Sequence, residues 1–322
     1  MRMMRWLLCG VAWWVAWWAA PAAHAQPYPT RPIRVVIPFP GGGGPMNMSG
    51  RVVQLLAPAL GQQLVLDNRP GADGAIGADV VIKSAPDGHT LFLASNSALS
   101  ALPHLRKKPP FDPLTAFEPV GFVGRITFFL LVHPSLPVKS AAELVNHVRA
   151  QPGKLTYGSG NTTAQVMMAQ FTSANKLDMV HVPYKGDVAV TADFVAGRVQ
   201  LLFGSTSFAG LMKDGRLRAL AVMLPTRLKG FPDLPSSEEA GIGQITVRPW
   251  AALVAPAKTP KAITERLNRE LNAVLAKPEG RDLLERESMD TQAMTPAELG
   301  AYIRTQLAVW GTAIKEAGIQ PD

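Results

Sequence analysis

Short runs of β-branched and aliphatic residues alternate with longer stretches of helical spacing along almost the whole of this 322-residue chain. Residues 33–39, 64–66 and 91–94 have the composition of strands, and helix-like segments at 47–60 and 72–84 separate them. Parallel strands need a crossover helix between them, so this alternation predicts an α/β architecture with mostly parallel sheets.

A second series of the same kind begins near residue 141. Further strands are expected at 154–157, 179–182, 199–203, 218–222 and 246–254. Helices are expected at 141–150, 163–175, 188–196, 260–276, 278–286 and 296–317. The last and third-last helices start well, because Thr259 and Thr295 each place a capping hydroxyl before a first-turn proline. Two βα series predict two α/β lobes, and the pattern does not assign the final helices to either lobe.

The N-terminus has the layout of a secretory signal peptide. Arg2 and Arg5 precede an uncharged run over 6–23, and Ala23-His24-Ala25 supplies the small residues of a cleavage site. We therefore expect cleavage near Ala25/Gln26 and export to the periplasm. The alternative is an uncleaved anchor, because the run approaches the ~20 apolar residues that span a bilayer. Pro21 and the small-residue end favour cleavage.

Removal of residues 1–25 would leave a chain without cysteine, since Cys9 is the only one. The mature protein then has neither a disulfide nor a thiol nucleophile, and a chain of this length can rest on its hydrophobic cores alone. The formal net charge of +8 includes two arginines of the removed segment. The one basic cluster, Arg106-Lys107-Lys108, has no aromatic platform or nucleic-acid motif beside it. We interpret it as a solvated loop and expect no nucleic-acid partner.

Three turns rich in glycine and small polar residues follow predicted strands. Glycines let the backbone approach a ligand, and a following helix N-terminus offers free N–H groups and partial positive charge, which suits a small anion. Strand ends at one edge of an open α/β sheet are also where ligands bind. The candidate ligand-binding residues are Phe39, Gly42, Gly43, Gly44, Asn47, Gly158, Ser159, Asn161, Thr162, Thr163, Tyr184, Gly204, Ser205 and Thr206.

Each of these candidates also has a structural interpretation. A glycine run can be a flexible turn, Asn47 is a good helix N-cap without any ligand, and Tyr184 can be a half-buried aromatic at a strand end. What favours a ligand site is that three such turns occur, not one, and that all three are uncharged. Several neutral donors can hold a small anion with little help from charged side chains.

Motifs for catalysis, metals and nucleotides are missing from the sequence. It contains no H-E-x-x-H, C-x-x-C, G-x-S-x-G or Walker A motif, and the histidines show no ligand-like spacing. The three turns hold no carboxylate pair for acid–base chemistry. We therefore expect neither an enzyme, nor a metal site, nor a cofactor.

Motifs distributed over the whole mature length resemble the Bug family of periplasmic solute-binding receptors, the binding component of tripartite tricarboxylate transporters. They are Tyr28-Pro29-Thr30-Arg31-Pro32-Ile33-Arg34, Pro38-Phe39-Pro40 with its glycines, Asn68-Arg69-Pro70-Gly71-Ala72-Asp73-Gly74, Ala85-Pro86-Asp87-Gly88, Pro152-Gly153-Lys154-Leu155-Thr156-Tyr157-Gly158-Ser159, His181-Val182-Pro183-Tyr184-Lys185-Gly186, Leu217-Arg218-Ala219-Leu220-Ala221-Val222 and Leu253-Val254-Ala255-Pro256-Ala257.

The resemblance implies a two-lobed periplasmic binding protein of type II, a Venus flytrap with two crossovers between the lobes. Lobe 1 would comprise 26–127 with 249–322, and lobe 2 would comprise 128–248. Ligand carboxylates would be held by Phe39–Asn47 on one lobe and by Gly158–Thr163 and Gly204–Ser207 on the other.

Two positions depart from the family pattern. The family usually has Asp where this chain has Asn47, and commonly Asp-Asn where it has Gly204-Ser205. Both changes remove a negative charge, so we expect a di- or tricarboxylate to be favoured over a zwitterionic amino acid.

The predicted function is that of an exported receptor that delivers a small carboxylate to a membrane permease and acts as a monomer. Two alternatives stay open, a ligand sensor for a signalling system and an exported enzyme acting on a small organic acid.

Overall fold

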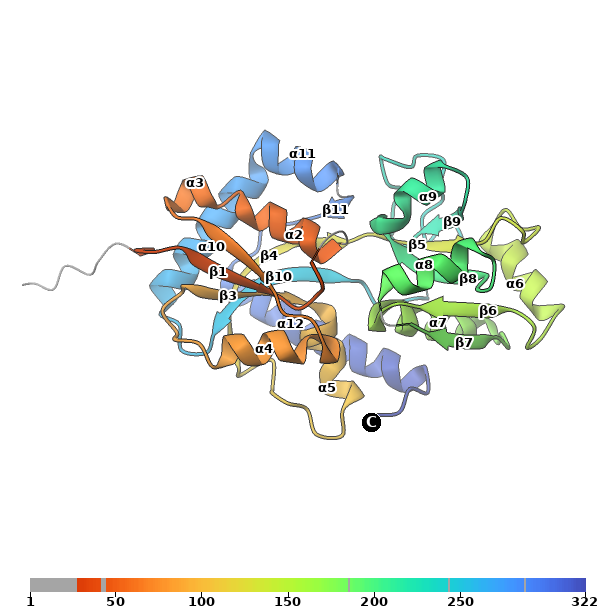
Figure 1. Ribbon diagram of the computed structural model, residues 1–322, viewed down its shortest axis with the longest axis horizontal. Helices are drawn as coiled ribbons and strands as arrows, with labels where there is room; N and C mark the ends of the chain where they lie inside the picture. Colours follow the sequence, from red (N-terminus) through yellow and green to blue (C-terminus); the bar gives the residue numbers. More distant parts are fainter. Residues whose placement is uncertain (1–27, 42–44, 185, 243, 287) are drawn as a thin grey trace, which may run out of the picture.

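The computed structural model describes residues 28–41, 45–184, 186–242, 244–286 and 288–322. Figure 1 shows that they form two lobes, each built around its own sheet. The predicted signal peptide and the candidates Gly42, Gly43 and Gly44 lie outside the described residues. Within the described part of the chain, no helix is long and apolar enough to cross a membrane.

The first sheet has the strand order β11-β4-β10-β3-β1-β2. Its strands are β1 (Ile33–Ile37), β2 (Leu64–Asn68), β3 (Thr90–Ser95), β4 (Phe117–Ile126), β10 (Trp250–Pro256) and β11 (Met289–Asp290). β1 pairs in parallel with β2 and β3, while β10 runs antiparallel between β3 and β4. The helices of this lobe are α2 (Pro45–Gln54), α3 (Ala57–Leu60), α4 (Ala75–Ile82), α5 (Leu102–Leu105), α10 (Lys261–Ala276), α11 (Pro278–Arg286) and α12 (Pro296–Glu316). Two short turns, the 3₁₀ turn η1 (Ala72–Gly74) and the π-helical turn η2 (Ser97–Ala101), follow β2 and β3.

The second sheet has the strand order β7-β6-β8-β5-β9. Its strands are β5 (Phe128–Val132), β6 (Thr156–Ser159), β7 (Val180–Pro183), β8 (Leu201–Ser205) and β9 (Arg218–Val222). β6 is parallel to β7 and β8, and β5 is antiparallel to β8 and β9. The helices are α6 (Ala141–Arg149), α7 (Thr162–Asn175), α8 (Asp187–Val195) and α9 (Ala209–Lys213), with a 3₁₀ turn η3 (Thr206–Phe208) directly after β8.

The chain passes between the two sheets twice. Thr127 alone separates β4 from β5, and the segment 223–249 returns from β9 to β10. The two passages lie side by side, because Ile126 N donates to Pro249 O at 2.8 Å and Met223 N donates to Phe128 O at 2.8 Å. Two α/β lobes joined by two adjacent crossovers confirm the fold predicted from the sequence. The exact lobe boundaries stay a prediction.

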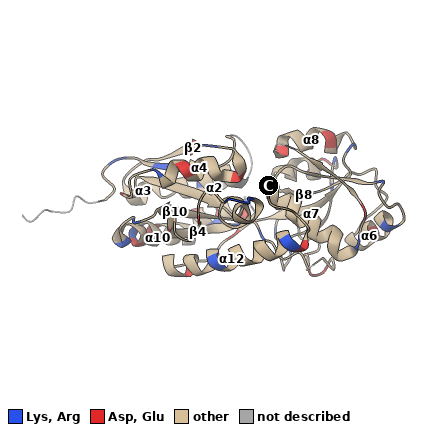
Figure 2. Cartoon of the chain, turned by 90° about the horizontal axis from the view of Figure 1, so that it is seen from below, with Lys and Arg blue, Asp and Glu red and all other residues tan. Residues whose placement is uncertain are grey.

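Helix α12 extends beneath both lobes (Figure 2). It contacts β4, α10 and η2 of the first lobe and α7 of the second. Its start is fixed by a capping box, in which the Thr295 side chain accepts from Glu298 N and the Glu298 carboxylate accepts from Thr295 N. The capping signal read from the sequence therefore sets the start of the longest helix.

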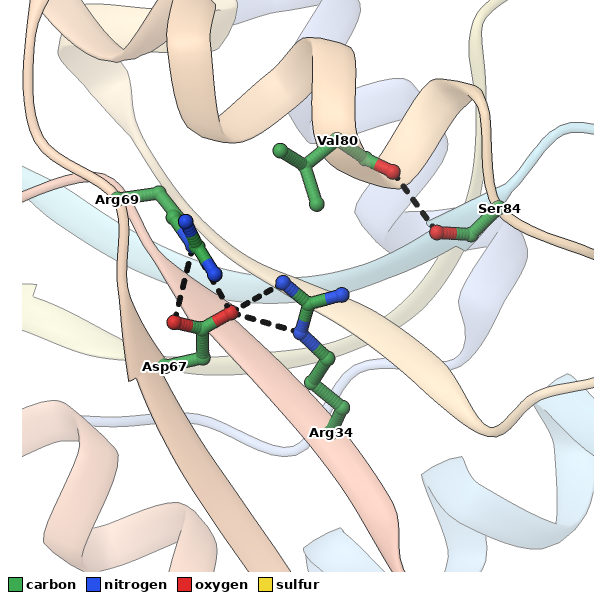
Figure 3. A network of polar contacts seen from close by, with 5 residues as sticks. All are labelled: Arg34, Asp67, Arg69, Val80 and Ser84. Carbon is green, nitrogen blue, oxygen red and sulfur yellow. Dashed lines mark hydrogen bonds and ion pairs between the residues drawn. The ribbon is translucent and has the colours of Figure 1, made fainter.

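The outer edge of the first sheet is held by ion pairs (Figure 3). Arg34 on β1 donates through Nε to Asp67 Oδ2 on β2 at 2.7 Å, and Arg69 donates through Nε to Asp67 Oδ1 at 3.0 Å. Burial raises the pKa of Asp67, but these hydrogen bonds outweigh it and hold the pKa below its ordinary value. The shared carboxylate links two parallel neighbours at the end where β2 leaves the sheet.

Several strand ends differ from those expected. β6 continues through Gly158 and Ser159, and β8 continues through Gly204 and Ser205, because their sheet neighbours keep pairing as far as Pro183 and Phe128. β10 begins at Trp250, since the residues before it belong to the second crossover. The break between β4 and β5 falls at Thr127, and Gly124 lies within β4, where it is paired with Ala251.

Candidate functional site

The carboxyl ends of the parallel strands in the two lobes face each other. β1, β2 and β3 are parallel, so their ends at Ile37, Asn68 and Ser95 lie along one edge of the first sheet. In Figure 1, β6 runs from the outer end of its lobe toward the first lobe. Asn96, directly after β3, donates through Nδ2 to Thr163 Oγ1 on α7 at 2.8 Å, which shows that the two edges meet.

The N-terminus of α7 is the centre of this meeting point. Asn161 is its N-cap, with an extended backbone and a side-chain oxygen that accepts from Ala164 N at 2.9 Å. The next residue, Thr162, donates its hydroxyl hydrogen to Asp73 Oδ1 of the first lobe at 2.8 Å. A 14-residue helix with a satisfied cap presents partial positive charge and backbone N–H groups at this end, the arrangement that binds anions.

Asp73 itself is held in place by Arg106. The Arg106 Nη2 donates to Asp73 Oδ2 at 2.9 Å, and Arg106 also pairs with Asp322. Asp73 has a φ of 54°, in the left-handed region, within the 3₁₀ turn that follows β2. The basic cluster lies in a loop with Lys107 and Lys108 exposed, as expected, but Arg106 is only partly exposed and its guanidinium supports a carboxylate that bridges the lobes.

Asp187, the first residue of α8, lies against the turn between β6 and α7. Its Oδ1 accepts from Asn161 Nδ2 at 2.9 Å. Burial raises the pKa of Asp187, and the hydrogen bond from Asn161 only partly offsets this. A side-chain carboxylate therefore stands beside the cap of α7, although the three turns themselves are uncharged.

Ser159, the last residue of β6, is buried and touches a histidine of the neighbouring strand. Its Oγ lies 2.7 Å from His181 Nε2 on β7. The His181 ring stacks on Tyr157 with ring centroids 4.8 Å apart, and burial lowers its pKa. The neutral imidazole fixes the Ser159 side chain at the strand end.

In the first lobe, the turn after β1 is organised by two amides. Asn47 Nδ2 donates to Pro40 O at 2.9 Å, and Asn68 Nδ2 donates to Asn47 Oδ1 at 3.0 Å and to Phe39 O at 2.8 Å. Asn47 lies inside α2, which begins at Pro45, so the N-cap interpretation of Asn47 was wrong. Its amide instead ties the helix to the turn.

Other candidates serve packing within the second lobe. Tyr184 donates its hydroxyl hydrogen to Asp193 Oδ2 at 2.7 Å, and burial and this carboxylate raise the pKa of Tyr184 to about 12. Gly204 packs so closely that a Cβ would lie 2.6 Å from the Phe208 ring and 2.8 Å from Leu131. Ser205 is buried and caps η3 by accepting from Ser207 N, and Thr206 begins that turn.

The structure thus brings Ser159, Asn161, Thr162 and Thr163 to the inter-lobe edge, where the strand ends of the first lobe meet the N-terminus of α7. Gly158, Tyr184, Gly204 and Ser205 instead serve packing and hydrogen bonding inside lobe 2. Sequence reasoning missed five residues at or beside this edge, namely Asn68, Asp73, Asn96, His181 and Asp187. For Asn96 a signal existed, since its amide directly follows the buried strand β3, whereas Asn68 ends the partly exposed strand β2. Among the described residues, no cluster of three or more His, Cys, Asp or Glu could hold a metal ion.

A surface hollow elsewhere on lobe 2 has Met212, Leu217 and Phe231 among its lining residues. It shares no residue with the inter-lobe edge.

The family model of the tripartite tricarboxylate transporter family receptor, TctC, matches residues 50–319. This chain belongs to the TctC receptor family. It is 31% identical over 307 residues to a UPF0065 protein of Bordetella pertussis, with 94% of each chain covered. It is also 31% identical over 308 residues to protein BugT of the same organism, with 93% of each chain covered.

Solved TctC-like structures share the whole two-lobed fold. R. palustris Rpa4515 with adipate superposes with a TM-score of 0.85 at 30% identity, covering 92% of this chain and 100% of that one. The periplasmic binding protein BugD gives a TM-score of 0.81 at 28% identity, with the same coverage. MatC from Rhodopseudomonas palustris with bound malate gives 0.78 at 25% identity, covering 89% of this chain and 100% of that one. These neighbours confirm the periplasmic binding protein fold and the receptor class predicted from the sequence.

Proposed function

We propose that this receptor binds a small carboxylate between its two lobes, with di- and tricarboxylates favoured, and delivers it to the membrane permease of a tripartite tricarboxylate transporter. The observation that carries the proposal is the N-terminus of α7, capped by Asn161 and directed at the strand ends of the first lobe. The binding groups would come from the turns Phe39–Asn47, Gly158–Thr163 and Gly204–Ser207, as predicted from the sequence, with Gly158, Gly204 and Ser205 contributing only backbone groups because they are packed inside lobe 2. The same proposal places the mature protein in the periplasm as a monomer.

Two solved relatives support the ligand class. Rpa4515 carries adipate and MatC carries malate, both of which are dicarboxylates. The likeness covers the whole receptor, so a comparable ligand in the corresponding place is the simplest expectation for this chain.

The electrostatics of the edge fit a ligand of this kind. Backbone N–H groups and a helix N-terminus bind a carboxylate strongly because they are already oriented toward its binding position in the free protein. The hydroxyls and amides of both lobes would donate hydrogen bonds to its oxygens. Because binding residues come from both lobes, a bound ligand would stabilise the arrangement in which the lobes touch.

An enzymatic role has one observation in its favour, the contact between Ser159 and His181. A serine nucleophile needs a base that a third group orients. In the described part of the chain, no carboxylate hydrogen-bonds to the other ring nitrogen of His181, and Ser159 is buried. We therefore assign this pair a structural role. A sensory role would need a signalling partner, for which no surface feature argues.

The test uses the mature protein, residues 26–322, purified without added ligand. Native mass spectrometry would identify what co-purifies, and a thermal-shift screen would compare mono-, di- and tricarboxylates with the matching neutral amides. A carboxylate at 100 times its dissociation constant should stabilise the protein by about 2.7 kcal/mol. Thr172 lies on α7, as Thr163 does, but near the C-terminal end of the helix and away from the edge where the lobes meet. Thr172→Val is therefore the control for Thr163→Val.

We expect Thr163→Val to weaken carboxylate binding and Thr172→Val to leave it unchanged. A neutral amide that binds more tightly than any dicarboxylate would refute the ligand class. Conversion of the bound acid to a product by the purified protein would establish the enzymatic alternative.

A further inference from the structure

We propose that Asp187 is a specificity-determining residue that selects carboxylates bearing a hydroxyl or ammonium group on the carbon next to the bound carboxylate. The inference rests on the proposed function and deepens it, because it names the substituent that the ligand carries. It departs from the sequence expectation that zwitterionic amino acids are disfavoured, because that expectation assumed an uncharged site and did not include the Asp187 carboxyl.

The position of Asp187 is fixed by the backbone of the neighbouring turn. A Cβ on Gly160 would lie 2.6 Å from Asp187 Oδ1 and 2.8 Å from Asp187 N. Only glycine at position 160 allows the β6–α7 turn to approach so closely. The parallel pairing of β6 and β7 sets the N-termini of α7 and α8 side by side, and Gly186, with a φ of 103°, turns the chain into α8.

The Asn161 side chain connects this carboxylate to the proposed carboxylate-binding end of α7. Its oxygen caps the helix at Ala164 N, while its nitrogen donates to Asp187 Oδ1. Asp187 therefore lies beside the first turn of α7, where Thr162 and Thr163 contact the other lobe. A ligand carboxylate on that turn would have its adjacent carbon close to Asp187.

The chemistry of Asp187 makes it an acceptor that is not yet saturated. Among the described residues, the Asp187 side chain hydrogen-bonds to Asn161 alone, and no arginine or lysine forms an ion pair with it. Burial raises its pKa, which is the behaviour of a carboxyl group that lacks a compensating cation. A plain methylene at this point leaves the group unsatisfied, whereas a hydroxyl or ammonium donates to it.

The Asp187 carboxylate also repels a ligand carboxylate that lies directly beside it. A ligand must therefore either keep its other carboxylate at a distance from Asp187 or carry a proton donor between that carboxylate and Asp187. A dicarboxylate with a substituted α-carbon satisfies both conditions.

The test measures dissociation constants by isothermal titration calorimetry for matched ligands that differ only at the α-carbon. One series is succinate, both enantiomers of malate, and aspartate; a longer series is adipate, 2-hydroxyadipate and 2-aminoadipate. In the wild-type protein we expect the substituted acids to bind about tenfold more tightly than the plain diacid, the increment of one hydrogen bond to a charged group. In Asp187→Asn this preference should fall below about threefold.

Asp178→Asn is the matched control, because Asp178 is exposed and precedes β7 at the far end of that strand. It changes the net charge equally and should keep the wild-type preference. Circular dichroism and the melting temperature would show that Asp187→Asn folds, and Asp187→Ser would repeat the test with a smaller side chain.

Plain diacids that bind the wild-type protein as tightly as the substituted ones would overturn the inference. A preference that persists in both Asp187 variants would also overturn it. If no carboxylate of either series or of the wider screen binds, the proposed function itself fails, which is a separate outcome.

Discussion

Asp73 and Thr162, which lie on different lobes, share a hydrogen bond in which the threonine hydroxyl donates to Asp73 Oδ1 at 2.8 Å. A second bond, from Asn96 to Thr163, lies one residue further along α7. Together they join the strand ends of one sheet to the helix that the other sheet presents. The lobes are therefore registered against each other by side chains as well as by their two crossovers.

The bond between Asp73 and Thr162 should contribute a measurable coupling energy. Hydrogen bonds to charged groups contribute about 1.5–3 kcal/mol, and partial exposure of the Asp73–Arg106 pair reduces this, so we expect about 1 kcal/mol. A double-mutant cycle with Asp73→Ala and Thr162→Val, measured by urea unfolding, isolates the term. Additive effects of the two substitutions, with no coupling, would show that the bond does not persist in solution.

The sequence predicted the fold well because hydrophobic periodicity and capping residues act locally. The strands of both series and the start of α12 at Thr295 follow from such signals, whereas the two crossovers were implied by the family resemblance. The cap expected at Thr259 was wrong, because Pro260 is the N-cap of α10 and the Thr259 hydroxyl donates to Pro256 O. The turns were predicted as loops, yet Ser159 and Ser205 end strands, because cross-strand pairing with distant neighbours decides where a strand stops.

The candidate site was harder to predict, since its charged members come from turns with no distinctive pattern. Asp73, which Arg106 holds in place, meets α7 only after the two sheets face each other, and Asp187 meets it only through the pairing of β6 with β7. No spacing in the sequence reports that arrangement, so the expectation of an uncharged site was incomplete.

The stability of the protein should reveal the raised pKa of Asp187. Because burial disfavours its ionised form, the folded state is destabilised at pH values above its folded pKa, and the cost disappears below the ordinary aspartate pKa of about 3.9. Asp187→Asn should therefore unfold at a higher temperature than the wild type at pH 7, and the difference should vanish as the pH falls below about 4. A variant that is less stable at pH 7 would contradict the burial argument.

His181 should produce the opposite pH dependence. Burial lowers its pKa, so its contribution to stability is complete above the ordinary histidine value of about 6.5 and is lost as the pH falls below it. His181→Gln should lower the melting temperature at pH 8, because the contact with Tyr157 is lost, and should reduce the loss of stability between pH 8 and 5. His147→Gln, on α6, serves as control. An unchanged pH profile in His181→Gln would show that His181 does not carry this dependence.

The capping box of α12 gives a prediction of stability alone. Thr295→Ala removes the side chain that accepts from Glu298 N and should cost about 1 kcal/mol of unfolding free energy. The backbone and side-chain donors of Thr295 lower the pKa of Glu298. The contribution of the Glu298 carboxylate to the capping box is therefore present above the ordinary glutamate pKa of about 4.3 and is lost as the pH falls. Thr305→Ala, in the exposed interior of the same helix, should change stability by no more than a few tenths of a kcal/mol. Equal effects of the two substitutions would contradict a capping role.

A crystal structure of the mature protein with its tightest-binding dicarboxylate tests the central claim most directly. The account predicts one ligand carboxylate within hydrogen-bond distance of the backbone at Ser159–Thr163, with donors of the first lobe on the opposite side of the ligand. A ligand found away from the N-terminus of α7, or held by one lobe alone, would contradict it.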